Sequence, residues 1–289
     1  MKKRKSMEDI IMDTVIMVVL VLFTFICVYP VWFVLMASFS SSTAVDMSHG
    51  VLFWPVNFSL KAYELVMENK LFVNGFINSI KLLCMALPIN LVLTMMCGYF
   101  LSCSGMMLKK PITALIMFTM YFSGGMIPAY LNVKDLGLYN SLWAVVLTSA
   151  MSVYNCFICR SAIDGIPDSL RESAYLDGAN DLQIIFKVII PLIKPTLAVL
   201  TMYYGVGHWS SWFSASIYLK DNDKLPIQNV LRSVLIQGQS TGVEAVFIDS
   251  YVETVKYAAI VIATVPILCI YPFLQKHFTK GVLVGAVKG

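Results

Sequence analysis

The chain carries little charge for its length. Only 13% of its 289 residues are charged and 58% are apolar, whereas soluble domains usually carry about a quarter charged residues. The apolar residues are gathered into long runs, whereas the helices of a soluble protein carry an apolar stripe along one face only. About 20 helical residues are needed to cross the hydrocarbon core of a bilayer. The sequence therefore predicts an all-α integral membrane protein and disfavours a soluble enzyme.

Motifs for nucleotide binding and catalysis are also missing. The sequence contains no P-loop, no glycine-rich dinucleotide fingerprint and no H-E-x-x-H. Ionisable residues at membrane depth are scarce, with Lys81, Lys256 and His208 as the candidates. A membrane enzyme would need a buried acid, base or metal set, and an ion-coupled carrier would need buried carboxylates. We therefore expect no catalytic residue, cofactor, metal or nucleic acid on this chain, and any nucleotide energy must come from another polypeptide.

The seven cysteines form no recognisable framework. Their number is odd, and all lie inside or at the ends of apolar runs. Cys156 and Cys159 have C-x-x-C spacing, but neither a second pair nor a nearby His completes a metal site. We expect the cysteines to be small packing residues without disulfides.

About six apolar runs are long enough to span a membrane. Gly124, Gly125 and Pro128 interrupt the third run, and Asn140 and Asn155 dilute the fourth. The first run is too long for the apolar part of a signal peptide and lacks a small-residue cleavage site, so we expect it to be retained. The predicted spans cover residues 14–39, 76–102, 111–131, 138–160, 195–218 and 257–275.

The basic residues predict the orientation. With these spans, most of the 21 Lys and Arg lie on the side of the N-terminus, including residues 2–5, Lys109 and Lys110. Short basic segments favour the cytoplasmic side of a membrane. We therefore expect both termini in the cytoplasm. The organisation expected is a cytosolic N-terminus, first span and external segment over 1–75, a membrane core over 76–275 with a cytosolic loop at 161–194, and a cytosolic tail over 276–289.

The cytosolic loop begins with a predicted short helix. Asp168 or Ser169 offers a side-chain oxygen that can cap the free backbone N–H groups of a helix start. Gly178 offers the left-handed backbone conformation that commonly ends a helix. The residues between them are therefore expected to form one short helix followed by a bend.

A second helix is predicted after the bend. Asn180 and Gln183 have the spacing of a capping box. The helix then runs over residues 182–190 and meets Pro191, where the chain re-enters the membrane. This amphipathic helix is expected to lie at the cytosolic surface of the membrane. By itself, such a loop is equally compatible with a structural and a functional role.

The same loop resembles a known family motif. Glu172-Ser173-Ala174 is followed after three residues by Gly178, and after nine more by Val188-Ile189-Ile190-Pro191. This is similar to the EAA loop of ABC importer permeases, which reads E-A-A, three residues, G, nine residues, I-x-L-P. Ser173, Val188 and Ile190 depart from that pattern by small or isosteric changes.

The resemblance extends over nearly the whole chain. Its further segments are similar to MalG-type carbohydrate permeases, and to their LplC/YtcP-like branch in particular, although Ser210 stands where Asn is usual. The segments are Gly124-Gly-Met-Ile-Pro-Ala-Tyr130, Leu136-Gly-Leu-Tyr-Asn140, Trp209-Ser-Ser-Trp-Phe213, Pro226-Ile-Gln, Tyr271-Pro-Phe-Leu-Gln-Lys276 and Lys280-Gly-Val. The resemblance implies a type I ABC importer (MetI-like) transmembrane domain that imports a carbohydrate, and an oligosaccharide is the substrate expected.

The resemblance also implies partners and a coupling site. The partners would be a second homologous permease subunit (MalF/LplB-like), two ATPase subunits that hold ATP and Mg, and an extracellular solute-binding protein. In this family the loop docks on the ATPase, with Glu172 supplying charge or hydrogen bonds, Ala174 close packing and Gly178 the bend. The ATPase-coupling residues expected are Glu172, Ser173, Ala174, Asp177, Gly178 and Pro191.

The substrate path is expected along the fifth span. Aromatic side chains with polar tips suit sugar rings, which present C–H patches beside hydroxyls. Trp209 and Trp212 also fit an interfacial aromatic belt, so the alternative stays open for them. The candidate path residues are Tyr203, Tyr204, His208, Trp209 and Trp212. An importer of another solute, and an ATP-independent carrier or channel, remain alternative functions.

Overall fold

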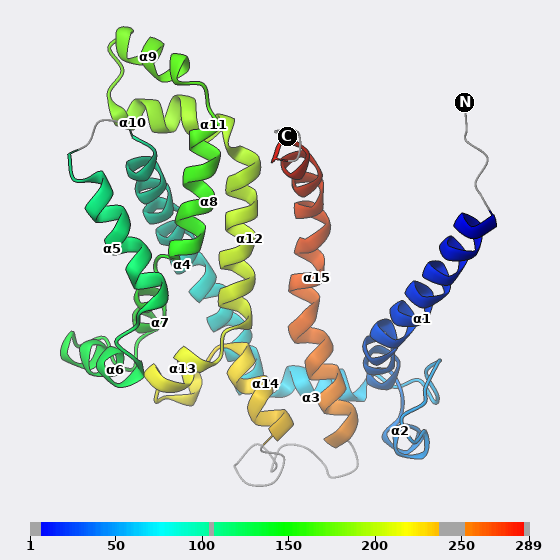
Figure 1. Cartoon of the computed structure of the whole chain (residues 1–289). Helices are drawn as coiled ribbons and strands as arrows, with labels where there is room; N and C mark the ends of the chain where they lie inside the picture. Colours follow the sequence, from blue (N-terminus) through cyan, green and yellow to red (C-terminus); the bar gives the residue numbers. More distant parts are fainter. Residues whose placement is uncertain (1–6, 104–106, 237–251, 286–289) are drawn as a thin grey trace. The chain divides into compact units, whose positions relative to one another are not determined.

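The computed structural model describes residues 7–103, 107–236 and 252–285 (Figure 1). Within these ranges every regular element is a helix, which confirms the all-α fold class. The basic residues 2–5, residues 237–251 of the long segment before the last span, and residues 286–289 lie outside the described residues. The elements are α1 (Met7–Ser38), α2 (Ser42–Met47), α3 (Lys61–Glu68), α4 (Lys70–Ser102), α5 (Lys109–Tyr121), α6 (Met126–Asp135), α7 (Leu142–Thr148), α8 (Val153–Asp164), α9 (Asp168–Leu176), α10 (Asp181–Ile184), the π-helix η1 (Ile185–Ile189), α11 (Ile190–Leu192), α12 (Lys194–Ser210), α13 (Phe213–Tyr218), the 3-10 helix η2 (Asn222–Lys224), α14 (Ile227–Ile236) and α15 (Val252–Gly285).

Three helices are long and apolar enough to cross a bilayer without a break. They are α1, α4 and the part Glu253–Ile270 of α15. Three bent pairs satisfy the same criterion together: α5 with α6 at 110°, α7 with α8 at 53°, and Asp181–Leu192 with α12 at 87°. If each bent pair is one span, the described chain has up to six, in agreement with the predicted number.

Two predicted spans end earlier than the sequence suggested. The third stops at Tyr121, and the chain turns sharply at Gly125, whose φ is +91°. The fifth was expected to reach residue 218, but α12 ends at Ser210 because Ser211 is extended, with ψ 128°. The side-chain amide of Asn229 donates to the Trp212 carbonyl at 2.9 Å. This tertiary hydrogen bond supports the break, and the residues beyond it form the separate helix α13.

The chain divides into two compact units. The first comprises Met1–Lys70 and Leu231–Thr264, and the second comprises Leu71–Val230 and Val265–Gly289. In the first unit, the segment after α1 folds back along that helix. Trp32 Nε1 donates to the carbonyl of Phe53 at 2.9 Å. The Tyr29 hydroxyl donates to the Gly50 carbonyl at 3.0 Å and accepts from the Leu52 N–H at 3.1 Å. These aromatic side chains therefore fix the chain that leaves the first span.

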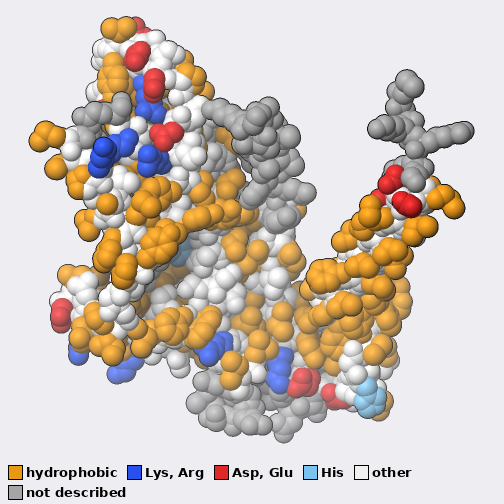
Figure 2. All heavy atoms as spheres, in the orientation of Figure 1, with side chains coloured by type: hydrophobic (Ala, Val, Ile, Leu, Met, Phe, Trp, Pro, Cys, Tyr) orange, Lys and Arg blue, Asp and Glu red, His pale blue; other side chains and the backbone are white. Residues whose placement is uncertain are grey.

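The second unit is a bundle in which α4, α5, α8 and α12 lie side by side (Figure 1). Helix α9 lies beyond one end of the bundle, and α6 and α13 lie at the opposite end. Figure 2 shows charged side chains near these two ends of the bundle and mainly apolar side chains between them. This distribution is that of a membrane-embedded bundle with two polar ends.

Helices α4 and α8 approach each other closely at Gly98. A Cβ atom on Gly98 would lie 2.8 Å from Cys159 Sγ and 2.9 Å from its Cβ. The thiol of Cys159 in turn lies 3.5 Å from the sulfur of Met95. Small residues permit such close approach of helices inside a membrane, where packing drives their association. The buried Cys159 is thus a packing residue at this crossing.

A single asparagine joins two loops at the end of the bundle that carries α13. Asn140 has a left-handed backbone, with φ +61°, a conformation that Asn tolerates better than most residues. Its N–H donates to the Tyr218 carbonyl at 2.8 Å, and its side-chain oxygen accepts from the N–H groups of Lys220 and Asp221. Its side-chain amide donates to Asp221 at 2.8 Å, which, with Lys224, lowers the pKa of that carboxyl. The ionised Asp221 carboxylate therefore stabilises the fold at pH values above the ordinary carboxyl pKa. This contribution to stability is lost as the pH falls through the lowered pKa.

Candidate functional site

The segment between α8 and α12 projects from one end of the bundle (Figure 1). Helix α9 begins at Asp168, but its N-cap residue is Pro167, which has no side-chain hydrogen bond to the helix. The expected capping by Asp168 or Ser169 is therefore wrong. Asp168 instead lies in the first turn, where its negative charge interacts favourably with the helix dipole. Proline fixes the backbone that enters the helix and so shifts the boundary by one residue.

Gly178 ends α9 in the way its position predicts. Its φ is +80°. Its N–H donates to the Tyr175 carbonyl and the N–H of Ala179 donates to the Ala174 carbonyl, both at 3.0 Å. These two bonds form a Schellman motif, which satisfies carbonyls at a helix end. The predicted bend is confirmed.

The capping box after the bend is also confirmed. The Gln183 N–H donates to the side-chain oxygen of Asn180 at 2.9 Å, and the Asn180 N–H donates to the side-chain oxygen of Gln183 at 3.0 Å. Both free donors at the start of α10 are thereby satisfied. The two arms of the bend are each fixed by their own local hydrogen bonds.

The returning arm contains a π-helical turn. The Ile190 N–H donates to the carbonyl of Ile185, five residues earlier, which is the hydrogen bond that defines a π-helix. This wider turn brings Ile184 and Ile189 to the same side, and both are fully buried. An uninterrupted α-helix would separate residues five apart by about 140° around its axis. The π-turn therefore aligns the apolar side of the arm with the bundle.

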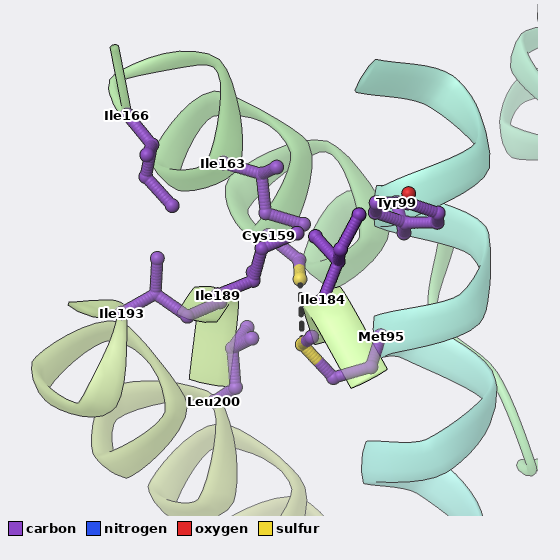
Figure 3. Close-up of a cluster of buried hydrophobic side chains, with 9 residues drawn as sticks. All are labelled: Met95, Tyr99, Cys159, Ile163, Ile166, Ile184, Ile189, Ile193 and Leu200. Atoms are coloured by element: carbon purple, nitrogen blue, oxygen red, sulfur yellow. Dashed lines mark hydrogen bonds between the residues drawn. The ribbon is translucent and has the colours of Figure 1, made fainter. Parts of the chain in front are cut away.

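The apolar side of the segment is buried against α4 and α8. Figure 3 shows the side chains of this cluster pointing toward one another from α4, α8, the returning arm and α12. Ala174 of α9 packs against it at the edge. The buried members are Met95, Tyr99, Cys159, Ile163, Ile166, Ile184, Ile189, Ile193 and Leu200.

Two polar contacts join α9 to the bundle. Arg171 Nη2 donates to the Ile163 carbonyl at 2.9 Å, near the end of α8. The Tyr175 hydroxyl donates to Asp181 Oδ1 at 2.5 Å, and the Tyr99 hydroxyl of α4 donates to the same oxygen at 2.7 Å. These donors lower the pKa of the Asp181 carboxyl, with Tyr175 as the main cause. At neutral pH the carboxylate is therefore ionised and accepts both bonds.

A polar cavity of about 510 Å³ lies where the span formed by α7 and α8 is broken. Residues 149–152 are not helical at this point. Irregular backbone at membrane depth is tolerated where protein or an aqueous cavity satisfies it. Seven of the eleven lining residues carry a hydroxyl group. The lining consists of Ser149, Met151, Ser152, Tyr154, Asn155, Tyr203, Tyr204, Gly207, His208, Ser211 and Ser214.

Asn90 of α4 forms hydrogen bonds with the non-helical backbone between α7 and α8. Its side-chain amide donates to the carbonyls of Ser149 and Ala150, each at 2.8 Å. Its side-chain oxygen lies 2.8 Å from His208 Nε2. Asn90 itself is fully buried. One side chain therefore pairs two backbone carbonyls that the break leaves free, and it also orients the imidazole of α12.

Tyr204 supports the other end of the same break. Its hydroxyl lies 2.6 Å from Thr94 Oγ1 and accepts from the Ser152 N–H at 3.0 Å. Tyr204 is buried, and its main role is to connect α12 with α4 and with the start of α8. Helix α4 thus holds both ends of the interruption, through Asn90 and Thr94.

Comparison with known proteins identifies the family. The chain matches, over residues 2–284, the family model described as "Binding-protein-dependent transport system inner membrane component". This chain belongs to that family. It is therefore a multi-pass inner-membrane transport component.

Two relatives from Bacillus subtilis (strain 168) are similar to this binding-protein-dependent transport component along most of its length. The polygalacturonan/rhamnogalacturonan transport system permease protein YtcP is 38% identical, covering 98% of this chain and 100% of its own. Protein LplC is 36% identical, covering 91% and 90%. A crystal structure of a bacterial ABC transporter involved in the import of the acidic polysaccharide alginate superposes with a TM-score of 0.90 and 33% identity, covering 96% of this chain and 100% of that chain.

The expected coupling residues of this transport component occupy different environments. Glu172, Ser173 and Asp177 are exposed, and the Ser173 hydroxyl donates to the Ser169 carbonyl of its own helix at 2.8 Å. Ala174 packs on the buried cluster, Gly178 forms the bend, and Pro191 lies in the first turn of α11. The structure therefore places three of these residues on the exposed side of the segment. Their role in coupling stays a prediction.

The expected path residues separate into two groups. Tyr203, Tyr204 and His208 line the polar cavity. Trp209 is buried edge-to-face against Phe76 at 5.6 Å and lines an apolar cavity of about 280 Å³ instead. Trp212 packs edge-to-face against Phe213. Neither tryptophan is among the residues that line the polar cavity.

Sequence reasoning missed the residues that support these sites from α4. Asn90, Thr94 and Tyr99 are buried residues of that helix. A clue was available, because a polar residue such as Asn inside a membrane span is rare and usually has a specific partner. Its partners, the backbone at the α7–α8 break, could not be identified without the fold. Asp181 was likewise visible only as part of a helix start.

Proposed function

We propose that this chain is the permease subunit of an ABC importer for an oligosaccharide. It would form half of the translocation pore with a second homologous permease subunit. Two ATPase subunits, which hold ATP and Mg, would dock on α9, and a solute-binding protein would deliver substrate on the other side. In this arrangement both termini are cytoplasmic. Family membership and the sugar polymers named for the relatives support the proposal.

The polar cavity carries the sugar assignment. Its lining offers serine and tyrosine hydroxyls, Asn155 and the imidazole of His208, and it contains no Lys, Arg, Asp or Glu. Neutral donors and acceptors beside aromatic faces suit sugar hydroxyls and C–H patches. Tyr203 is 40% exposed and Tyr154 56% exposed, so their rings are accessible to a ligand. The carboxylates of an acidic sugar would have to be matched by groups outside this lining.

The exposed side of α9 supports docking of an ATPase. Leu176 is 89% exposed, although it is apolar, and Glu172 and Asp168 are exposed on the same short helix. Leu170 and Tyr175 of the same helix are also exposed, and exposed apolar surface rimmed by charges is typical of an interaction site. ATP-driven closure of two ATPase subunits can move membrane helices through such a stiff element as a rocking of rigid bodies.

The function is tested by reconstitution with its partners. The chain is purified with the second permease subunit, the ATPase and the solute-binding protein, and ATP hydrolysis is measured with neutral and uronic-acid oligosaccharides. We expect at least one sugar class to stimulate hydrolysis and to enter proteoliposomes. Stimulation by a peptide or polyamine instead of any sugar would contradict the assignment.

The cavity can be tested with two matched glycine substitutions on α12. Gly207 lines the polar cavity and Gly205 the apolar one, and a Cβ on either would meet nothing within 4 Å. A side chain at either position therefore begins in open space. We expect Gly207→Leu to lower sugar uptake roughly tenfold or more, equivalent to about 1.4 kcal/mol of binding, and Gly205→Leu to lower it much less. Equal effects of the two, in complexes of equal yield, would show that the polar cavity is not on the sugar path.

A further inference from the structure

Tyr99, Tyr175 and Asp181 form a small polar cluster that ties the projecting segment to one bundle helix. The two hydroxyl groups share Asp181 Oδ1, at 2.7 Å for Tyr99 and 2.5 Å for Tyr175. They also lie 3.2 Å from each other. Tyr99 is buried in α4, whereas Tyr175 is 50% exposed on α9. The cluster therefore connects an exposed helix with the interior of the bundle.

The cluster is not needed to shape the bend. The Schellman motif at Gly178 and the Asn180–Gln183 capping box already fix the backbone on both sides of the turn. The bonds from Tyr175 and Tyr99 converge on one carboxylate from two different helices. Their effect is to fix the position of α9 relative to α4. Hydrogen bonds to a charged group are stronger than neutral ones, which suits a joint that must bear force.

Helix α4 also leads from this cluster to the cavity wall. Asn90, Thr94 and Tyr99 are all buried on this helix, with Asn90 and Thr94 one turn apart and Tyr99 on a different side. Asn90 holds the carbonyls of Ser149 and Ala150, and Thr94 contacts Tyr204, which holds the N–H of Ser152. From Asn90 to Tyr99 the helix advances about 14 Å, at 1.5 Å per residue. One continuous helix therefore touches both the segment that carries α9 and the broken span.

We propose that Tyr99, Asp181 and Tyr175 are positioning residues that pass the movement of α9 to α4, and through α4 to the α7–α8 break at the polar cavity. This proposal rests on the proposed docking of an ATPase on α9. In this joint, Asp181 keeps α9 and α4 moving as one body. Arg171, which donates to the end of α8, provides a second attachment that keeps the segment folded when the joint is cut.

The test separates coupling from assembly. Tyr175→Phe and Asp181→Asn are each purified in the complete complex, and sugar uptake and ATP hydrolysis are measured in the same proteoliposomes. We expect the amount of sugar imported per ATP hydrolysed to fall roughly fivefold or more, the lower end of usual coupling between sites. A purely structural role would instead lower uptake and hydrolysis in the same proportion. Tyr121→Phe, at an exposed tyrosine of α5, is the matched control and should leave the ratio unchanged.

A double-substitution cycle checks that the residues act through one carboxylate. If they do, Tyr175→Phe combined with Asp181→Asn should be no worse than Asp181→Asn alone, because interacting residues are not additive. Asp181→Glu should restore part of the ratio. An unchanged ratio in Asp181→Asn, or additive losses, would overturn the proposal.

Failure of this joint can be told apart from failure of the proposed function. The exposed side of α9 is altered separately with Leu176→Asp and the ATPase retained by the complex is measured. If Leu176→Asp releases the ATPase while Asp181→Asn behaves as the native chain, docking stands and the joint is wrong. If Leu176→Asp retains the ATPase and full uptake, the docking proposal itself fails.

Discussion

Replacing Gly178 with valine is expected to reduce sugar uptake by one to two orders of magnitude. The native φ of +80° is rarely accessible to residues with a Cβ atom and least to β-branched ones. Space is not the obstacle, because a Cβ at this position would meet nothing within 4 Å. The effect is therefore backbone strain of about 1–3 kcal/mol, which corresponds to roughly a 5- to 150-fold loss of the native bend. Uptake and copurified ATPase, measured on membranes with equal permease content, report the result.

Two variants of the same segment serve as controls. Gly178→Asn should retain more uptake than Gly178→Val, because Asn adopts the left-handed conformation more readily. Gly165→Ala should have little effect, since Gly165 has φ −77° and any residue can adopt that backbone. Native uptake in Gly178→Val would show that the bend is not required for coupling.

Replacing Asn90 with leucine is expected to destabilise the bundle strongly. The substitution leaves the carbonyls of Ser149 and Ala150 and the imidazole of His208 without their side-chain partner. Hydrogen bonds between membrane helices are worth about 0.6–1.7 kcal/mol each, so three of them amount to roughly 2–5 kcal/mol. We expect a lower folded yield in detergent and a lower thermal midpoint. Both are measured by size-exclusion chromatography after heating.

Thr201→Val provides the matched control for this loss. The Thr201 hydroxyl donates to the Leu197 carbonyl of its own helix at 2.7 Å, so its removal costs a hydrogen bond within one helix. His208→Ala removes one of the three bonds and should fall between the two variants. A thermal midpoint of Asn90→Leu equal to that of Thr201→Val would mean that the break is held by other groups.

The helical fold could be read from the sequence because it depends on composition over long windows. Runs of about 20 apolar residues predict spans regardless of their neighbours, and the glycines near 124–125 marked a real bend. The end of α12 at Ser210 could not be anticipated, because the Trp212 carbonyl is satisfied by Asn229 from a later helix. The 110° and 53° bends depend in the same way on what packs around them.

In the candidate site, too, features set by local interactions could be predicted, whereas features set by distant residues could not. Gly178 and the Asn180–Gln183 pair follow local backbone rules, so the sequence predicts them correctly. The helix start was misplaced because Pro167 dominates the local geometry over the two possible caps. Asn90, Tyr99 and Asp181 act through partners far away in the chain, and spacing alone gives no information on such pairs.

The π-turn in the returning arm makes the length of this segment as important as its residues. Surface loops generally tolerate insertions and deletions, but here Ile184 and Ile189 are both fully buried only because one wide turn lies between them. Inserting one residue between Gly178 and Pro191 would rotate everything before the insertion by about 100° relative to α12. The apolar side of the arm would then face water, and α9 would present a different side to its surroundings. In an engineered or chimeric transporter, this segment should therefore be exchanged as one block of fixed length.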